Sequence, residues 1–472
     1  MTSLADWVRN LSGKDIPVLR STIDALRHLR KKEDTLTARD LSQMVLCDPL
    51  MTLKVLRFSQ SRLTKRQPTE VTTVEHAVMM PGLTSFFAEM KSLQAIEDQM
   101  AGQPHALEGA LRVISRATHA GSYARSFSAL RHDMESDEVV TSALLHDLGE
   151  LLLWNVAPGI AVQIEHMTRH HRGLRSATAQ RACLGFELVE LQLALAKEWK
   201  LPALLQSLMD DHHADTPRVT TVALSVALAR HSANGWGDEA LPSDYTAIQK
   251  LVNLPPANAM RYIRQAALIA AHTWNFTGIR PAAAWLPLLP GDWPDEDDAP
   301  LSEDTADVMI RVTQQLAHLG PHLCDVALIS ALVFYALHVA LGARHIWFGA
   351  LEGTGAKIVT QQALMLEPGL LPGELAFPVG SPHLFSRLMG KVQGLWFSDA
   401  HRVKLSPLLP PALVNKLGNR EFFAMSVHLK GQPYGMIYMD GGSHKPKLSE
   451  TDYAGFKSLC MTMSQALERR GP

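Results

Sequence analysis

The feature that most constrains this chain is a stretch over residues 281–300 that cannot hold a long helix. Its prolines remove backbone hydrogen-bond donors, and the acidic run Asp295–Asp298 repels itself. Such a segment is typical of an exposed linker. Because 472 residues also exceed the usual size of one core, we expect two domains, over 1–280 and 301–472.

The composition excludes several classes of protein. Hydrophobic residues make up 46% of the chain and charged residues 19%, which argues against a disordered chain or an integral membrane bundle. A formal charge of -2 provides no field to attract nucleic acid, so no nucleic-acid partner is expected. The 4 cysteines form no CxxC pair, and no secretory signal opens the chain, which favours the cytoplasm. Polar residues interrupt the uncharged segment Val326–Ala343, so we interpret it as a buried helix and expect no membrane partner.

The first 280 residues have the apolar spacing of amphipathic helices. Thr37 is a plausible N-cap with Asp40 at the third helical position, and Asp48-Pro49 begins the next helix. The N-terminal domain should therefore be all-α. The predicted helices include Leu19–Leu29, Leu111–Leu130, Val139–Trp154, Leu188–Trp199, Val219–Ala229 and Ala257–His272.

The pattern changes after the linker. Two helices are predicted over Glu303–Leu319 and Cys324–Leu341, followed by a strand over His345–Leu351 and another that begins at Lys357. Alternating apolar residues on either side of Lys430–Pro433 predict a hairpin with a four-residue loop. A last helix is expected over Glu450–Arg469. The C-terminal domain should therefore be α+β.

The candidate chemical site is the adjacent pair His146 and Asp147 within an apolar segment. Burying an imidazole and a carboxylate is costly unless each has a partner. His119 lies on the preceding helix, and His212 and His213 follow on a later segment. The pair is therefore either a polar packing cluster, in which Asp147 fixes one imidazole tautomer, or part of a divalent-metal site that activates water.

These residues and their surroundings resemble the HDOD branch of the metal-dependent HD phosphohydrolases. The resemblance implies an all-helical signalling output module, common in bacteria and often fused to a sensor domain. It also implies His119, His146, Asp147 and His213 as metal ligands, with His212 as a supporting or phosphate contact. It covers about residues 10–275 and is carried by Ile16-Pro17-Val18, Leu41–Leu56 with Asp48-Pro49, Val74–Leu83, the His146 block and His212-His213.

One position departs from the hydrolase pattern. The family's hydrolases need a further aspartate on a later helix, and the best register of Val222–Arg230 places Val226 there. Valine cannot bind a metal, and the Gly-Tyr-Pro signature of the HD-GYP enzymes does not occur. We therefore predict a non-catalytic module with no certain cofactor. The alternative is a metal-dependent phosphohydrolase or phosphodiesterase.

The C-terminal domain resembles a GAF-type sensor in its order of helix, strand, loop, hairpin and closing helix. Such a domain implies a ligand pocket over one face of an antiparallel sheet. Aromatic residues can equally fill the core, so both interpretations stay open. The candidate pocket residues are Trp347, Phe377, Trp396, Phe422 and Tyr438.

Together the two resemblances imply a bacterial signal-transduction protein. Its HDOD-like domain would bind other signalling proteins, and its GAF-like domain would sense a small molecule or mediate homodimer formation. A ligand that favours one C-terminal conformation would change which helical surface is offered to a partner.

Overall fold

The computed structural model divides the chain into two compact units. The first unit lies within residues 1–161 and 186–299, and the second within residues 162–185 and 300–472. The two units therefore do not follow the order of the chain, since Val162–Gly185 packs with the C-terminal residues. The described residues are 3–62, 71–171, 174–210, 216–274, 281–282, 305–352, 357–367, 376–410, 413–414 and 417–469.

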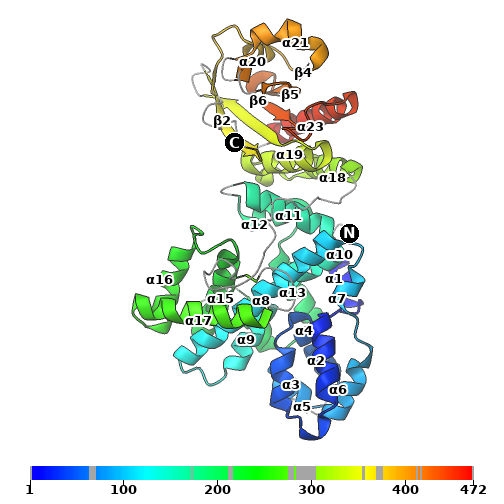
Figure 1. Cartoon of the computed structure of the whole chain (residues 1–472), viewed down its shortest axis with the longest axis vertical. Helices are drawn as coiled ribbons and strands as arrows, with labels where there is room; N and C mark the ends of the chain where they lie inside the picture. Colours follow the sequence, from blue (N-terminus) through cyan, green and yellow to red (C-terminus); the bar gives the residue numbers. More distant parts are fainter. Residues whose placement is uncertain are drawn as a thin grey trace. The chain divides into compact units, whose positions relative to one another are not determined.

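The first unit is helical in its described residues, as the sequence predicted (Figure 1). The long helix α8 packs against α9, α10, α15 and α17, and an apolar core lies between α8, α9, α15, α16 and α17. The helices are α1 (Leu4–Ser12), α2 (Arg20–Arg30), α3 (Ala38–Val45), α4 (Pro49–Arg62), α5 (Val74–Met79), α6 (Leu83–Glu89), α7 (Ile96–Gln99), α8 (Pro104–Leu130), α9 (Ser136–Leu145), α10 (Leu148–Val156), α13 (Leu188–Glu198), α14 (Ala203–Leu208), α15 (Pro217–Ala233), α16 (Leu241–Val252) and α17 (Pro256–Trp274).

Local chemistry explains where several of these helices begin and end. Thr37 and Asp40 form the predicted capping box of α3, and α4 begins at Pro49. The prediction of one helix over Val139–Trp154 was wrong, because α9 ends and α10 begins on either side of His146 and Asp147. At the start of α10, a Cβ on Gly149 would lie 2.7 Å from the backbone oxygen of Leu188, so only glycine allows this close approach to α13.

The second unit contains an antiparallel sheet of 6 strands in the order β3-β2-β1-β6-β5-β4. The predicted fold class, an all-α module followed by an α+β GAF-like domain, is confirmed. The strands are β1 (His345–Leu351), β2 (Lys357–Met365), β3 (Phe377–Pro378), β4 (Gly394–Phe397), β5 (Phe422–Leu429) and β6 (Gln432–Asp440). The helices are α11 (Pro158–His170), whose first residues belong to the first unit, α12 (Ser176–Leu184), α18 (Thr305–His318), α19 (Val326–Leu341), α20 (Leu384–Leu388), α21 (Asp399–Leu405) and α23 (Glu450–Glu468).

The hairpin between β5 and β6 is tighter than predicted. Its loop consists of Lys430 and Gly431 alone, with φ of 50° and 78°. Positive φ at both positions defines the type I′ turn, which matches the twist of the two strands. Gln432 and Pro433, which were predicted in the loop, instead pair with Leu429 and His428.

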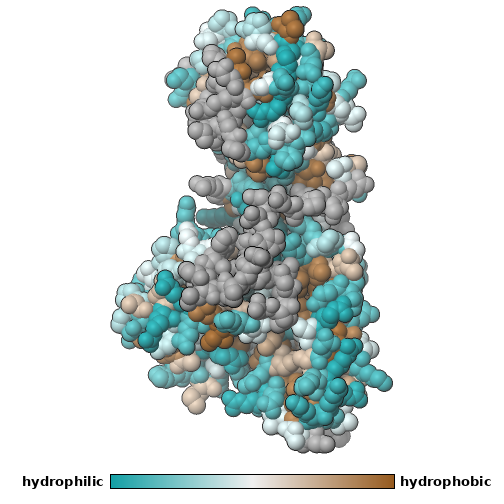
Figure 2. Space-filling view, in the orientation of Figure 1, coloured by the Kyte–Doolittle hydropathy of each residue, from teal (hydrophilic) through white to brown (hydrophobic). Residues whose placement is uncertain are grey.

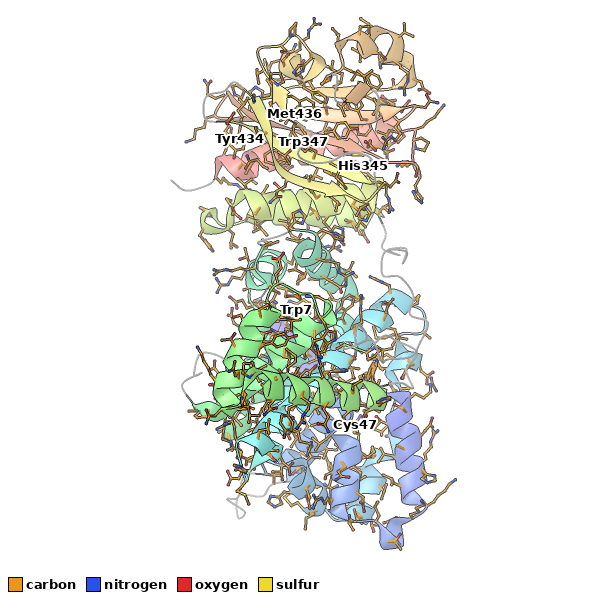
Figure 3. All side chains as sticks on the ribbon, turned by 60° about the vertical axis from the view of Figure 1, so that its left-hand side comes forward. Trp7, Cys47, His345, Trp347, Tyr434 and Met436 are labelled. Carbon is orange, nitrogen blue, oxygen red and sulfur yellow. The ribbon has the colours of Figure 1, made fainter. Side chains whose placement is uncertain are left out.

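The two faces of the sheet have different partners. Side chains alternate between the faces along each strand, so Trp347 and Met436 share one face (Figure 3). This face carries an apolar core that includes Phe385 of α20. The opposite face, which carries Phe423, packs against α23.

The predicted linker lies outside the described residues, apart from Pro281 and Ala282. Within the described chain, no helix is both long and apolar enough to cross a membrane. The segment from Val326 forms α19, whose side chains are largely buried, as predicted. Figure 2 shows a mostly hydrophilic described surface with scattered hydrophobic residues.

Candidate functional site

The predicted site is centred on Asp147, at the junction of α9 and α10. Its side chain is 5% exposed and accepts a hydrogen bond from the guanidinium of Arg230 on α15. Arg116 on α8 reaches the same carboxylate, with Nε 3.9 Å from Oδ2, and donates to Glu150 at 2.6 Å. The carboxylate therefore lies between two arginines, which we call the arginine clamp (Arg116 and Arg230).

The electrostatics of Asp147 follow from this geometry. Burial alone would raise the pKa of its carboxyl group. The charges of Arg230 and Arg116, together with the neighbouring ring of His146, outweigh burial, so the pKa falls well below its usual range. Asp147 is therefore a carboxylate at neutral pH, with its charge balanced by cations that the chain itself supplies.

The two histidines of the site have different partners. His146 Nδ1 lies 3.7 Å from Asp147 Oδ1. His119 is fully buried and its Nδ1 donates to the backbone oxygen of Ser115 at 2.8 Å. Burial lowers the pKa of His119 to about 4, so its ring is neutral at pH 7. Its Nε2 has no hydrogen-bond partner among the described residues, and the lone pair on this nitrogen is suited to a metal.

The side chains do not assemble into a metal centre in the part of the chain that the structure describes. No group of three His, Cys, Asp or Glu residues there could hold a metal ion. Val226 lies in the apolar core of the first unit, with 3% of its surface exposed. His212 and His213 lie outside the described residues. The sequence reasoning missed Arg116 and Arg230, although Arg230 lies one helical turn after Val226.

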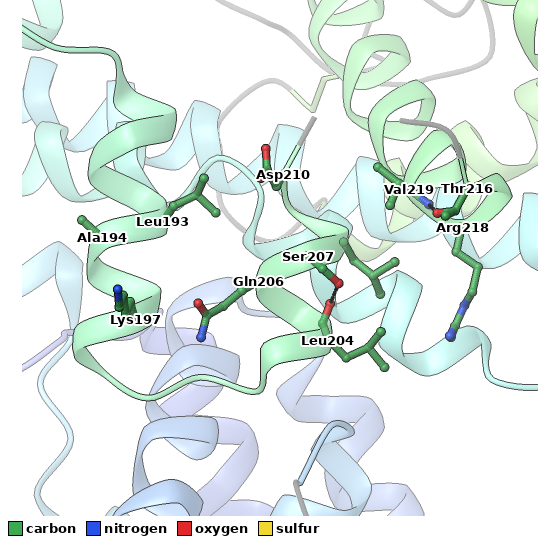
Figure 4. A pocket seen from close by; sticks show the side chains of 11 residues that line it. Leu193, Ala194, Lys197, Leu204, Gln206, Ser207, Asp210, Thr216, Arg218 and Val219 are labelled. Atoms are coloured by element: carbon green, nitrogen blue, oxygen red, sulfur yellow. Dashed lines mark hydrogen bonds between the residues drawn. The ribbon is translucent and has the colours of Figure 1, made fainter. Parts of the chain in front are cut away.

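A cavity of about 680 Å³ opens elsewhere in the first unit, between α13, α14 and α15 (Figure 4). Its walls include Leu193, Leu204 and Val219. Its charged lining residues are Lys197, Asp210 and Arg218, of which Arg218 is paired with Asp133, Glu135 and Glu138. None of His119, His146 and Asp147 lines this cavity.

The five aromatic residues predicted to line a pocket do not share one face of the sheet. Trp347, Phe377, Phe422 and Tyr438 pack together in the apolar core of the second unit. Their rings touch one another, with centroids 5.5 Å apart for Trp347 and Phe377 and 5.1 Å apart for Phe422 and Tyr438. Trp396 points to the opposite face, where it contacts Phe423 and Tyr453. The prediction that all five line one pocket was therefore wrong for Trp396.

The same core contains a polar network that sequence reasoning missed. His345 on β1 (Figure 3) shares a 2.8 Å hydrogen bond between Nδ1 and Asp440 Oδ1, and Tyr438 donates to Asp440 Oδ2 at 2.5 Å. Burial would lower the pKa of His345, but the bond to Asp440 and its charge raise the pKa above its usual value. Arg420 adds a second cation 3.5 Å from Asp440. A pairing of His345 with Asp440 across neighbouring strands is visible only once the strand order is known.

Comparison with known families finds a match that lies mostly within the first unit. Residues 16–215 match the HDOD domain family, so the chain contains an HDOD domain. This match includes Val162–Gly185, which packs in the second unit. A search of curated proteins found no match.

Several solved structures are similar to parts of the chain. The MmoQ response regulator of Methylococcus capsulatus is 19% identical, over 53% of this chain and 98% of its own, with a TM-score of 0.41. A virulence factor of Campylobacter jejuni is 15% identical, over 57% of this chain and 100% of its own, with a TM-score of 0.39. The GAF domain of an Acinetobacter phosphoenolpyruvate-protein phosphotransferase is 15% identical, over 35% of this chain and 94% of its own, with a TM-score of 0.24.

Proposed function

We propose that this chain is a bacterial signalling protein whose HDOD domain is a non-catalytic output module. In this proposal the domain binds partner proteins, and the GAF-like second unit regulates that binding. The observation that carries the proposal is the arginine clamp on Asp147. A hydrolase would need this carboxylate as a metal ligand, whereas here two guanidinium groups already neutralise it.

Charge explains why the clamp opposes metal binding. A divalent ion at Asp147 would have to approach two fixed positive charges, of which Arg116 is largely buried and hence poorly screened. It would gain few ligands in return, because Val226 offers none and His119 offers only Nε2, since its Nδ1 bonds to the backbone oxygen of Ser115. The surroundings of Asp147 therefore support a packing role for the His-Asp pair.

The division of the chain supports regulation by the second unit. Helix α11 begins in the first unit, and its remaining residues pack in the second. There Gln163 accepts hydrogen bonds from Arg311 and Gln315 of α18, at 3.0 Å and 3.3 Å. A ligand or dimer contact that shifts α18 would also shift α11, because Gln163 joins the two helices, and α11 continues into the HDOD domain. Such a shift would change which HDOD surface is offered to a partner.

Metal binding tests the non-catalytic part of this proposal. Full-length protein purified without chelator would be titrated with Mn²⁺ by calorimetry, and its turnover of bis(p-nitrophenyl) phosphate would be measured. We expect no stoichiometric binding and no turnover above that of Asp147→Ala. Stoichiometric Mn²⁺ that is lost in Asp147→Ala but kept in the surface control Asp24→Ala would overturn the proposal in favour of the phosphohydrolase.

Hydrogen exchange tests the regulatory part. Gln163→Leu removes the hydrogen bonds to α18, whereas Gln180→Leu alters a half-buried glutamine of α12 that donates a hydrogen bond to Ser176 of the same helix. We expect only Gln163→Leu to change amide protection in α10 and α15, next to Asp147. Equal protection in both variants would show that the second unit does not act on the HDOD domain through α11.

A further inference from the structure

Four histidines gather in the second unit, where α11 packs against α19. The ring of His166 lies 4.5 Å from that of His170 and 5.3 Å from that of His338, between centroids. His171, directly after α11, lies 5.5 Å from the ring of Phe334 on α19. We call His166, His170, His171 and His338 the histidine cluster.

His166, at the centre of this cluster, lies where a positive charge would be unfavourable. His166 is 8% exposed, and neither of its ring nitrogens has a hydrogen-bond partner among the described residues. Its other ring neighbour is Tyr335, at 5.2 Å. An imidazolium at this position would be buried without an acceptor for either N–H, which is costly.

The groups around the cluster do not compensate for such a charge. Burial lowers the pKa of His166 well below its usual value, and His170, His338, His171 and Arg169 all lower it further. Glu165, one residue away, is paired with Arg169. Neighbouring elements also place titratable or charged groups toward the cluster. From α19 these are Tyr335 and His338, and Arg344 follows that helix. Arg311 of α18 donates a hydrogen bond to Tyr335, and Cys183 of α12 contacts Met167 of α11.

The geometry points to an acid-sensitive latch: we propose that the histidine cluster holds α11 against α19 while its rings are neutral and releases it when they are protonated. Protonation of His166 would place like charges 4.5 Å and 5.3 Å apart once His170 or His338 is also charged. The segment Val162–Gly185 would then leave α18 and α19. This inference does not depend on the state of the Asp147 site or on the proposed output function.

The direction of the pH effect follows from proton linkage. Burial lowers the pKa of His171 to about 4 and lowers the pKa of His166 and His338, so the released segment binds more protons than the packed one. Packing is therefore strongest above the ordinary histidine pKa of about 6.5 and weakens as pH falls below it. Between pH 7.5 and 5.5, each such histidine lowers the equilibrium constant for packing of this segment about tenfold. His166 and His171 together therefore lower that constant about 100-fold.

Hydrogen exchange of the full-length protein at pH 7.5 and 5.5 tests the latch. After correction for intrinsic exchange rates, we expect protection of the amides in α11 and α12 to fall by about 100-fold at pH 5.5. Protection in α23 of the same unit should change far less. Unchanged protection of α11 relative to α23 would refute the proposal.

Substitutions show whether His166 is responsible. His166→Phe keeps an aromatic ring against Tyr335 and His338 but cannot be protonated, and it should reduce the loss of protection about tenfold. The matched control is His272→Phe, at an exposed histidine of α17, which should leave the wild-type pH dependence intact. If His166→Phe disturbs the fold, its α11 protection at pH 7.5 will reveal this. In that case the comparison of amide protection in α11 and α23 of the wild-type protein at the two pH values still tests the proposal. An equal pH effect in wild type and in a folded His166→Phe protein would assign the effect to other groups.

Discussion

Removing the charge of Arg230 tests the arginine clamp most directly. In Arg230→Met the aliphatic stem remains, but the Asp147 carboxylate loses its nearest cation. Breaking a fully buried ion pair costs about 3–5 kcal/mol. Because the Arg230 side chain is 47% exposed and Arg116 still reaches Asp147, we expect the first unit to lose roughly 1–2 kcal/mol of unfolding free energy.

A double-mutant cycle isolates the interaction. The unfolding free energy of the first unit would be measured by urea denaturation for wild type, Arg230→Met, Asp147→Asn and the double variant. We expect a coupling energy of about 1 kcal/mol or more, and a melting temperature for Arg230→Met roughly 3–6 °C below that of wild type. The exposed control Arg39→Met should change stability by less than about 0.5 kcal/mol. A coupling energy indistinguishable from zero would refute the clamp.

The same variants give a pH signature. The pKa of Asp147 is lowered in the folded protein, so its contribution to stability is present above the unfolded pKa of about 3.9. That contribution is lost as pH falls toward the folded pKa. The difference between wild type and Arg230→Met should therefore be complete at pH 7 and should shrink below about pH 4. A difference that stays constant with pH would assign the effect to packing rather than to charge.

Three further predictions concern the second unit. Lys430→Asn should stabilise it by about 0.5 kcal/mol in urea unfolding, because asparagine suits the positive φ of a type I′ turn better than lysine; a destabilised variant would contradict this. Gly435→Ala should lower the unfolding free energy by about 2–4 kcal/mol in the same assay, because a Cβ would lie 2.2 Å from a backbone oxygen of β1. The control Gly380→Ala should lower it far less, because a Cβ there meets no atom within 4 Å. NMR titration of His345 should give a pKa above its usual value, and Asp440→Asn should lower it, because the carboxylate favours the protonated ring; an unchanged midpoint would show that Asp440 does not set this pKa.

The elements that sequence reasoning predicted well depend on local patterns. Helix α3 has the predicted cap at Thr37, and β1 has the predicted bounds His345–Leu351. Apolar periodicity and capping chemistry act within a few residues, so the sequence displays them directly. The break between α9 and α10 was missed because the apolar spacing of the sequence continues across it.

The grouping of Val162–Gly185 with the second unit depends on contacts that no local pattern reports. By sequence this segment falls within residues 16–215, which match the HDOD domain family. What places it in the second unit is the packing of side chains such as His166 against Tyr335. The predicted domain boundaries therefore stay a prediction. Sequence order assigns Val162–Gly185 to the N-terminal domain, whereas its contacts group it with the second unit.

The site shows why a motif alone did not define its chemistry. The sequence predicted a site at His119, His146 and Asp147 by residue type, and it predicted that Val226 stands where the family's hydrolases have an aspartate. It could not show that α15 also carries Arg230 to the Asp147 carboxylate, because that depends on the packing of α15 against α8 and α9. Loss of an acidic ligand lowers metal affinity, and a guanidinium on the remaining acid lowers it further by repulsion. Val226 and Arg230 both disfavour a bound metal, and both lie on α15. In other sequences with a His-Asp pair, a basic residue one helical turn after a position that lacks the expected aspartate would therefore indicate a similar arrangement.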